Sequence, residues 1–372
     1  MSACPNCAAA VGAGDEFCEA CGQALREGAR PAPEPLAHVE PTARTEPTEP
    51  PTAATIAPSP GRCACGGTFD TDGWCDKCGQ RVPSDRDHLV VTISPRLAAV
   101  CDKGRHHLRN EDAVALAEVG CRLVLVVCDG VSSTTDSDVA AVAAAIASRD
   151  VLAVAPPPDS ESPAARVEYY SDLMSTAATA ANAEAVAAAR QVGGENAPSC
   201  TFAAAVVDRD LVVAGWVGDS RVYWLGDDRT ALQLSIDDSW VTEQVDHGMS
   251  RTHAEADPMA HSITRWLGAD AIDPTARCGS LAATGAGWVL VCSDGLWNYC
   301  SGASDLADLI TKYDNFDPTE LAGHLVDWAN EQGGHDNITV ALARVEGDEL
   351  PGSAATPDRT QTDAAGPQTR SS

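Results

Sequence analysis

Apolar residues along the chain fall into short runs separated by turn-forming residues, a pattern that predicts β-strands. The stretch TFAAAVVDRDLVVAGWV predicts a hairpin that turns at Asp208–Asp210, and RVYWLGDDRTALQL predicts another that turns at Gly226–Asp228. Because such turns leave no room for crossover helices, much of the sheet should be antiparallel. The predicted strands lie near 89–101, 121–128, 201–207, 211–217, 221–225, 231–234, 287–292 and 338–345.

Longer segments predict helices, the last of which has a clear start. Asp317 is a suitable N-cap, Pro318 suits the first helical position, and Glu320 follows three residues after the cap. Strand runs combined with long helices indicate an α+β fold in which sheets pack on each other and helices cover them. The predicted helices lie at 136–149, 162–192, 302–313 and 318–332.

Composition divides the chain into a globular region and flanking segments. Residues 87–346 have the apolar patterning of a globular domain. Residues 26–61 are rich in Pro, Thr, Ala and Glu and lack an apolar period, which predicts a disordered linker. Residues 347–372 predict a disordered tail. Two cysteine-rich segments, 1–25 and 62–82, lie on either side of the linker.

The charge and hydropathy of the chain exclude several classes of protein. A formal net charge of -29 and a pI near 4.4 argue against binding nucleic acid or an anionic membrane by general electrostatics. No stretch of about eighteen residues is apolar enough to predict a membrane span. The N-terminal sequence lacks a basic region followed by an apolar core, so we expect no secretory signal and a cytoplasmic location.

The 15 cysteines therefore need an explanation that does not involve disulfides, which remain the alternative. Those near the N-terminus form closely spaced pairs that resemble short zinc ribbons with four thiolate ligands each. Such short segments cannot hold a core, so zinc would supply their folding energy. Their role, as docking or spacing modules, stays open. The predicted ligands of the two structural zinc ions are Cys4, Cys7, Cys18 and Cys21, and Cys63, Cys65, Cys75 and Cys78.

Three apolar runs end at an aspartate that lies beside a glycine: Asp129, Asp219 and Asp294. An Asp-Gly pair commonly marks a hairpin turn. No strand follows promptly after Asp129 or Asp294, however, and helix-like segments come next. Carboxylates at strand ends, with glycine leaving the backbone accessible, suit a site that gathers ligands from several strands.

Two further acidic motifs precede apolar runs: NEDA, with Glu111 and Asp112, and HDNITV, with Asp336 and Asn337. If these carboxylates converge with those at the strand ends, their repulsion requires cations. Hard oxygen ligands without a thiolate favour magnesium or manganese over zinc. Two such ions would acidify a water between them and hold the oxygens of an in-line displacement at phosphorus. The candidate ligands are Glu111, Asp129, Asp219, Asp294 and Asp336.

Eight motifs occur in an order that resembles the bacterial metal-dependent serine/threonine protein phosphatases of the 2C type. They are DKGRHHLRNEDA, VVCDGVSS, SCTFAAAV, GWVGDSRVYWL, SIDDSW, SITRWLG, LVCSDGLWN and GGHDNITV, and they span about residues 90 to 345. The resemblance implies a four-layer α-β-β-α sandwich of two mostly antiparallel sheets, with two manganese or magnesium ions between the sheets. A metal-bridging hydroxide would then attack phosphorus without a phosphoenzyme.

The resemblance also implies a role for each matching residue. Glu111 and Asp129 would bind one metal, and Asp129 would bridge to the other, aided by the Gly130 carbonyl. Asp294 and Asp336 would complete the second metal site.

The remaining matches are less direct. Asp219, together with Asp294, matches the position of a third metal found in bacterial members. Asp112 and Asn337 would support the ligands without binding metal themselves.

Two positions depart from the family pattern. His107 stands where an arginine usually holds the substrate phosphate, and Arg105 and Arg109 flank it as candidate substitutes. An imidazole cannot grip phosphate in the bidentate manner of a guanidinium, which puts phosphate affinity in doubt. Val131 replaces a histidine of eukaryotic relatives that could protonate the leaving group, a residue that bacterial relatives also lack, so a metal-bound water would have to donate that proton.

The leading hypothesis is thus a serine/threonine phosphatase that acts on phosphorylated proteins and opposes a bacterial Ser/Thr kinase. The alternative is a phosphatase-like binding protein in which His107 marks lost catalysis and the ribbons dock a partner. A nucleic-acid-linked zinc scaffold with a vestigial domain is the third hypothesis, although the ribbons carry few basic residues. Thr45 and Thr48 in the linker are either phosphorylation sites or part of a plain spacer.

Overall fold

The computed structural model describes residues 62–63, 65–71, 73–131, 136–154, 162–192, 197–313 and 317–347. It also describes the antiparallel strands β1 (Ser2–Ala3) and β2 (Ala10–Val11). The predicted linker, the predicted tail beyond Gly347 and the first four cysteines of the chain lie outside these residues.

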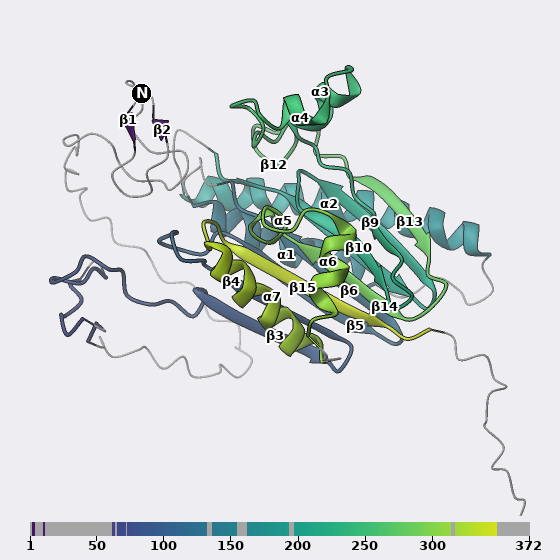
Figure 1. Cartoon of the computed structure of the whole chain (residues 1–372), viewed down its shortest axis with the longest axis horizontal. Coiled ribbons are helices and arrows are strands. Elements are labelled where there is room, and N and C mark those ends of the chain that lie inside the picture. Colours follow the sequence, from purple (N-terminus) through teal and green to yellow (C-terminus); the bar gives the residue numbers. More distant parts are fainter. Residues whose placement is uncertain are drawn as a thin grey trace, which may run out of the picture.

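Two antiparallel sheets form the centre of the domain (Figure 1). The six-stranded sheet has the order β11 (Ala231–Gln233), β10 (Arg221–Gly226), β14 (Gly287–Cys292), β15 (Ile338–Val345), β4 (Leu97–Asp102) and β3 (His88–Ser94). The five-stranded sheet has the order β13 (Arg277–Ala282), β9 (Leu211–Val217), β8 (Phe202–Asp208), β6 (Arg122–Cys128) and β5 (Ala113–Val119). A short pair, β7 (Ser199–Cys200) and β12 (Leu267–Gly268), lies beside them.

Helices cover the outer face of each sheet, which gives four layers. Figure 1 shows α6 (Ala303–Ile310) and α7 (Pro318–Gln332) on one side, and α1 (Ser137–Leu152) and α2 (Pro163–Val192) on the other. Side chains such as Trp216 and Val291 fill the space between the sheets because the inner faces of both sheets are apolar. The four-layer α-β-β-α sandwich expected from the sequence is therefore confirmed.

Local sequence signals predicted many of these elements correctly. The hairpins β8–β9 and β10–β11 turn where expected, with Arg209 and Arg229 in the left-handed region. Asp317 caps α7 by accepting from the backbone N–H groups of Thr319 and Glu320. Helices α1 and α5 (Asp294–Trp297) lie at or soon after the two Asp-Gly pairs, as the helix-like segments there predicted, so these pairs do not mark hairpins.

Other elements differ from the prediction. The single strand expected near 89–101 is two strands, because the chain turns at Pro95 and Arg96 and pairs β3 with β4. Strands β5 and β13 were not predicted. The two short helices α3 (Trp240–Asp246) and α4 (Arg251–Ala254) were also missed, and they lie together beyond one end of the sheets (Figure 1). No helix of the described ranges is both long and apolar enough to cross a membrane.

Sheet topology brings the acidic motifs to one end of the domain. Strands β6 and β9 run parallel to each other, separated by β8, and end just before Asp129 and Gly218-Asp219. In the other sheet, β14 ends just before Ser293-Asp294, beside the start of β15, which follows Asn337.

Candidate metal centre

The end of β6 carries Asp129 on a hydrogen-bonded turn. The Asp129 N–H donates to Thr201 Oγ1 at 3.0 Å, and Thr201 Oγ1 lies 2.7 Å from Ser220 Oγ. The next position, 130, favours glycine, because a Cβ atom there would lie 2.6 Å from the Glu111 carbonyl oxygen. Glycine therefore allows the segment that carries Glu111 to approach the end of β6.

The end of β14 is built in the same way. Asp294 begins the short helix α5, and Ser293 Oγ accepts from the Thr339 N–H at 2.9 Å. A Cβ atom at Gly295 would overlap the Asn337 carbonyl oxygen. The second Asp-Gly pair thus brings the starts of α5 and β15 together.

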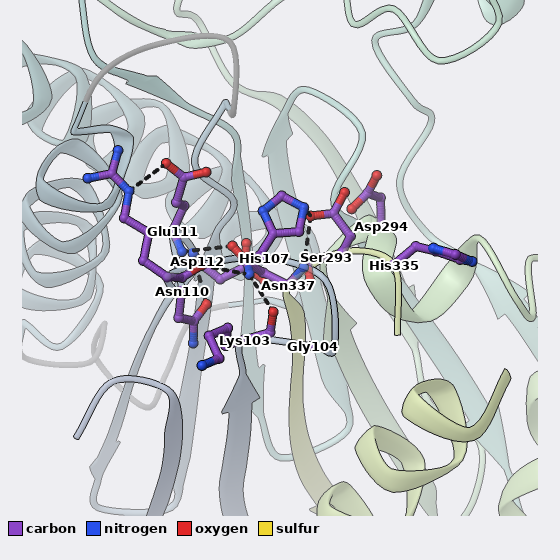
Figure 2. A network of polar contacts seen from close by, with 12 residues as sticks. Lys103, Gly104, His107, Asn110, Glu111, Asp112, Ser293, Asp294, His335 and Asn337 are labelled. Atoms are coloured by element: carbon purple, nitrogen blue, oxygen red, sulfur yellow. Dashed lines mark hydrogen bonds and ion pairs between the residues drawn. The ribbon is translucent and has the colours of Figure 1, made fainter. Parts of the chain in front are cut away.

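Asn337 connects three backbone segments at this end of the domain. Its Oδ1 accepts from the Glu111 N–H at 2.8 Å, and its Nδ2 donates to the carbonyls of Lys103 and Arg109 at 2.8 and 3.1 Å. Figure 2 shows Asn337 between Glu111 on one side and Asp294 on the other. An amide side chain suits this position since it offers both a donor and an acceptor.

The Glu111 carboxylate is itself held on two sides. Its Oε1 accepts from Ser137 Oγ at 2.7 Å and from Arg109 Nε at 3.1 Å, and the side chain is 7% exposed. Ser137 is the first residue of α1, so that helix helps to orient Glu111. No sequence motif indicated the role of Ser137.

Strong mutual repulsion marks the carboxylates at the strand ends. Burial, together with the negative charges of Asp112 and Asp294, raises the pKa of Asp129 well above its ordinary value. Burial and the charges of Asp336 and Asp219 do the same to the pKa of Asp294. Repulsion thus acts among five aspartates at this end of the domain, and cations would relieve it. They are Asp112, Asp129, Asp219, Asp294 and Asp336.

Asp112 provides an independent indication of a cation. It is 1% exposed, and its Oδ2 accepts from Thr339 Oγ1 at 2.7 Å. Its Oδ1 is buried and has no hydrogen-bond partner. Burial and the charge of Asp336 raise the pKa of Asp112 to about 6. A buried carboxylate among hard oxygen ligands adds negative charge that a magnesium or manganese ion nearby would offset.

Asp219 lies on a turn that is anchored by side chains from other elements. Burial, with repulsion from Asp237, raises the pKa of Asp219 to about 7. The Asp219 carbonyl accepts from Trp297 Nε1 at 2.9 Å. Arg221 stacks 3.7 Å above the Trp297 ring and binds the Asp237 carboxylate through Nε and Nη2 at 2.9 and 2.6 Å.

A second buried carboxylate fixes the other side of this turn. Asp238 Oδ2 accepts from the Gly218 N–H at 3.1 Å and pairs with Arg265 at 3.2 Å, and its Oδ1 pairs with Arg277 at 3.1 Å. Asp238 and Arg265 lie in the motifs SIDDSW and SITRWLG, but their role could not be predicted because their contacts join distant parts of the chain.

The structure separates the three candidates for phosphate contact. His107 Nε2 lies 3.1 Å from Asp336 Oδ1, and the side chain is 16% exposed. Arg109 binds Glu111 and the carboxylates of Asp136 and Asp138 at 3.2 and 3.6 Å. Arg105 is exposed, and its N–H donates to the Gly334 carbonyl at 2.8 Å. His107 and Arg109 therefore contact the predicted ligands directly, whereas the exposed Arg105 contacts the backbone of Gly334.

A groove of about 670 Å³ opens beside this end of the sheets. Asp219, Asp294 and Trp297 line one part of it, and the segment with α3 and α4 lines another. A groove of this size can admit an extended peptide segment to the carboxylates.

The four cysteines of the second predicted ribbon form a separate cluster. One ligand atom from each of Cys63, Cys65, Cys75 and Cys78 lies within 4.8 Å of all the others. The cluster has the thiol number and compactness of a tetrathiolate zinc site. Cys4, Cys7, Cys18 and Cys21 lie outside the described residues.

Comparisons with known proteins agree with this geometry. The family model described as "Protein phosphatase 2C" matches residues 103–330. The protein phosphatase PhpP of Streptococcus pneumoniae is 37% identical over 141 residues, which cover 37% of this chain and 54% of that protein. The serine/threonine protein phosphatase PstP of Mycobacterium tuberculosis is 30% identical over 259 residues, 68% of this chain and 46% of that protein. The chain thus spans about half the length of these relatives.

Solved structures share the fold. The crystal structure of the Mycobacterium tuberculosis serine/threonine phosphatase PstP/Ppp has a TM-score of 0.55 and 25% identity, covering 69% of this chain and 100% of that one. The catalytic domain of PstP in complex with two manganese ions has a TM-score of 0.53 and 24% identity, covering 68% and 98%.

Proposed function

Because the chain belongs to the protein phosphatase 2C family, we propose that it is a metal-dependent serine/threonine phosphatase that hydrolyses phosphoserine and phosphothreonine in proteins. The observation that carries the proposal is the convergence of Asp129, Asp219 and Asp294 on one buried, mutually repelling cluster. Such a cluster suits divalent cations and, with them, phosphoester hydrolysis. The matched relatives, named as phosphatases, support the same reaction.

Two manganese or magnesium ions fit the oxygen donors of this cluster. Glu111 and Asp129 would hold one ion, and Asp129 with the Gly130 carbonyl would also contact the other. Asp294 and Asp336 would complete the second site. When bound, the ions would neutralise phosphate charge and lower the pKa of the attacking water.

The neighbouring side chains would orient these ligands. Asn337 fixes the backbone at Glu111, and Asp112 is held by Thr339, which supports their assignment as positioning residues. Asp219, with Asp294, would hold a third ion next to the groove.

Phosphate contacts would come from the cationic residues of the loop before Glu111. His107 and Arg109 lie against Asp336 and Glu111, which supports a role for both at the edge of the cluster. The exposed Arg105 is the further candidate. Imidazole and guanidinium N–H groups can both donate to phosphate oxygens, although only guanidinium does so in a bidentate manner.

Hydrolysis of p-nitrophenyl phosphate with manganese tests the proposed reaction. We expect kcat of the Asp129→Asn and Asp294→Asn variants to fall about 100-fold or more. Replacing even residues that only orient metal ligands can lower activity by that much. Asp228→Asn, on the exposed turn between β10 and β11, is the matched control and should retain activity. Equal rates for the wild type and both centre variants would reject catalysis at this site, and release of phosphate from phosphothreonine peptides would extend the result to the proposed substrates.

We further propose that the four-cysteine cluster binds one structural zinc ion and that Cys4, Cys7, Cys18 and Cys21 bind another. The compact arrangement of Cys63, Cys65, Cys75 and Cys78 supports the first site. We also propose a cytoplasmic location, where thiols stay reduced. There the phosphatase would act in signal transduction by opposing a Ser/Thr kinase.

A further inference from the structure

The second cysteine cluster is joined to the metal centre by a very short connector. Val82 still belongs to the cluster, since its N–H donates to the Gly73 carbonyl at 2.7 Å. Only Pro83, Ser84 and Asp85 separate it from Arg86, and β3 begins two residues later at His88. Arg86 therefore lies between the cluster and the domain, and it precedes the segment matched by the family model, which starts at residue 103.

Arg86 binds the backbone on both sides of Glu111. Its Nη2 donates to the Asp112 carbonyl at 2.8 Å and to the Asn110 carbonyl at 3.3 Å. The contact is reciprocal, because Asn110 Nδ2 donates to the Arg86 carbonyl at 2.9 Å. Asn110 is 3% exposed, so this exchange takes place in the interior of the protein.

A second route leads from the same connector to the same residue. The Lys103 N–H donates to the Asp87 carbonyl at 2.9 Å, and Lys103 Nζ pairs with Asp87 Oδ2 at 2.9 Å. The Lys103 carbonyl in turn accepts from Asn337 Nδ2, and Asn337 Oδ1 accepts from the Glu111 N–H. Figure 2 shows Lys103, Asn110 and Asn337 grouped around the backbone at Glu111.

We propose that Arg86 is a positioning residue that pre-orders the backbone at Glu111 and so raises the affinity of the centre for divalent metal. Hydrogen bonds from a charged guanidinium to two carbonyls are strong enough to fix a short loop. Without them, the loop must be ordered when metal binds, and part of the binding free energy is lost to conformational entropy. The inference rests on the proposed function, because it requires Glu111 to be a metal ligand.

Calorimetric titration of the full chain with Mn²⁺ tests this role directly. We expect Arg86→Ala to weaken manganese binding about tenfold, as is typical of residues that hold a ligand in place. Arg86→Lys should give an intermediate affinity because an ammonium cannot match the fork geometry of guanidinium. At saturating manganese, kcat on p-nitrophenyl phosphate should be close to that of the wild type in all of these variants, since Arg86 does not reach the reacting atoms.

Arg166→Ala provides the matched control. Arg166 also donates to a backbone carbonyl, that of Asp208, but at the far end of β8, so its loss should lower stability without changing manganese affinity. Wild-type affinity in a folded Arg86→Ala variant would overturn the role of Arg86. If that variant does not fold, Arg86→Lys decides, and wild-type affinity there would overturn it as well. A wild-type chain that binds neither manganese nor magnesium would overturn the proposed function instead.

Discussion

Burial and mutual repulsion favour the protonated form of individual carboxylates at the centre. Asp219 has a pKa of about 7 because burial and the charge of Asp237 disfavour its ionised form. Burial and the charges of neighbouring aspartates raise the pKa values of Asp129 and Asp294 in the same direction. Without bound metal, repulsion among these carboxylates therefore destabilises the folded chain. Protons relieve the repulsion at low pH, and cations would relieve it at neutral pH.

This state predicts how Asp219 affects stability without metal. Its folded-state pKa exceeds its ordinary value of 3.8, so the folded chain binds more protons than the unfolded chain between these values. The stability that protonated Asp219 contributes to the fold is complete below pH 3.8 and is lost as the pH rises through about 7. Asp219→Asn removes the titration, so in excess chelator it should raise Tm more at about pH 8 than at about pH 5, by roughly 2–4 °C.

Scanning calorimetry at both pH values, with and without saturating manganese, checks this expectation. Manganese should abolish or reverse the gain at the higher pH, because the ion requires the carboxylate that the variant lacks. The same gain in Tm at both pH values in chelator would contradict the account of Asp219.

At the scale of elements, the centre depends on strand ends that approach each other closely. Gly295 and Gly130 each sit where a Cβ would collide with a carbonyl oxygen from a neighbouring segment. Both Asp-Gly pairs were visible in the sequence, and so were the apolar runs before them. The reason for each glycine was not visible, because Asn337 and Glu111 are brought to these positions only by the folded sheets.

Replacing glycine with alanine should change stability in opposite directions at two positions, because Gly295 is crowded and Gly323 is not. Gly295→Ala should lower the free energy of unfolding by about 1–3 kcal/mol, because the new methyl group forces the starts of α5 and β15 apart. It should also weaken manganese binding. Gly323→Ala in α7, where a Cβ meets no atom within 4 Å, should instead stabilise the chain by about 0.5–1 kcal/mol.

Urea denaturation of both variants measures these changes in the free energy of unfolding. Gly323→Ala is the control for a general effect of adding a methyl group. Unchanged stability and unchanged manganese affinity in Gly295→Ala would mean that the two segments can separate without cost.

Sequence patterns predicted elements best where a local signal exists. The cap of α7 and the turns at Arg209 and Arg229 depend on neighbouring residues, so they could be predicted. Strand β13 could not, since most of its residues are exposed and it is held by pairing with β9. In the same way, the aspartates of the centre could be proposed from motifs, whereas Ser137, Arg221 and Asp238 act through contacts that only the tertiary structure creates.

For the whole molecule, the described part combines a large two-sheet domain and a small thiol cluster with different sources of stability. The domain has three extensive apolar clusters, two on the outer faces of the sheets and one between them. Residues 62–82 have few buried side chains, among them Cys63 and Cys75. A segment this small rarely folds without a metal or other cross-link, so if it binds the proposed zinc ion, loss of that ion should unfold it while the domain stays intact.

Replacing one thiol separates these two parts. Cys75→Ser should lower the zinc content by one ion per chain and make residues 62–82 sensitive to protease, while the main thermal transition of the domain is retained. Cys121→Ser is the matched control, because Cys121 is exposed at the turn between β5 and β6. Elemental analysis and limited proteolysis provide the measurements. An unchanged zinc content in Cys75→Ser would show that the cluster does not bind the ion.

Strand order also has a consequence for synthesis on the ribosome. The last described strand, β15, does not lie at an edge but is inserted between β4 and β14. Strand β4 is synthesised much earlier than β15, and β14 is synthesised just before it. Asp336 and Asn337 directly precede it. A nascent chain therefore cannot finish its six-stranded sheet, or assemble the full set of carboxylates, until nearly the whole domain has emerged. Prematurely terminated products that end before residue 336 would lack both this strand and the carboxylate of Asp336.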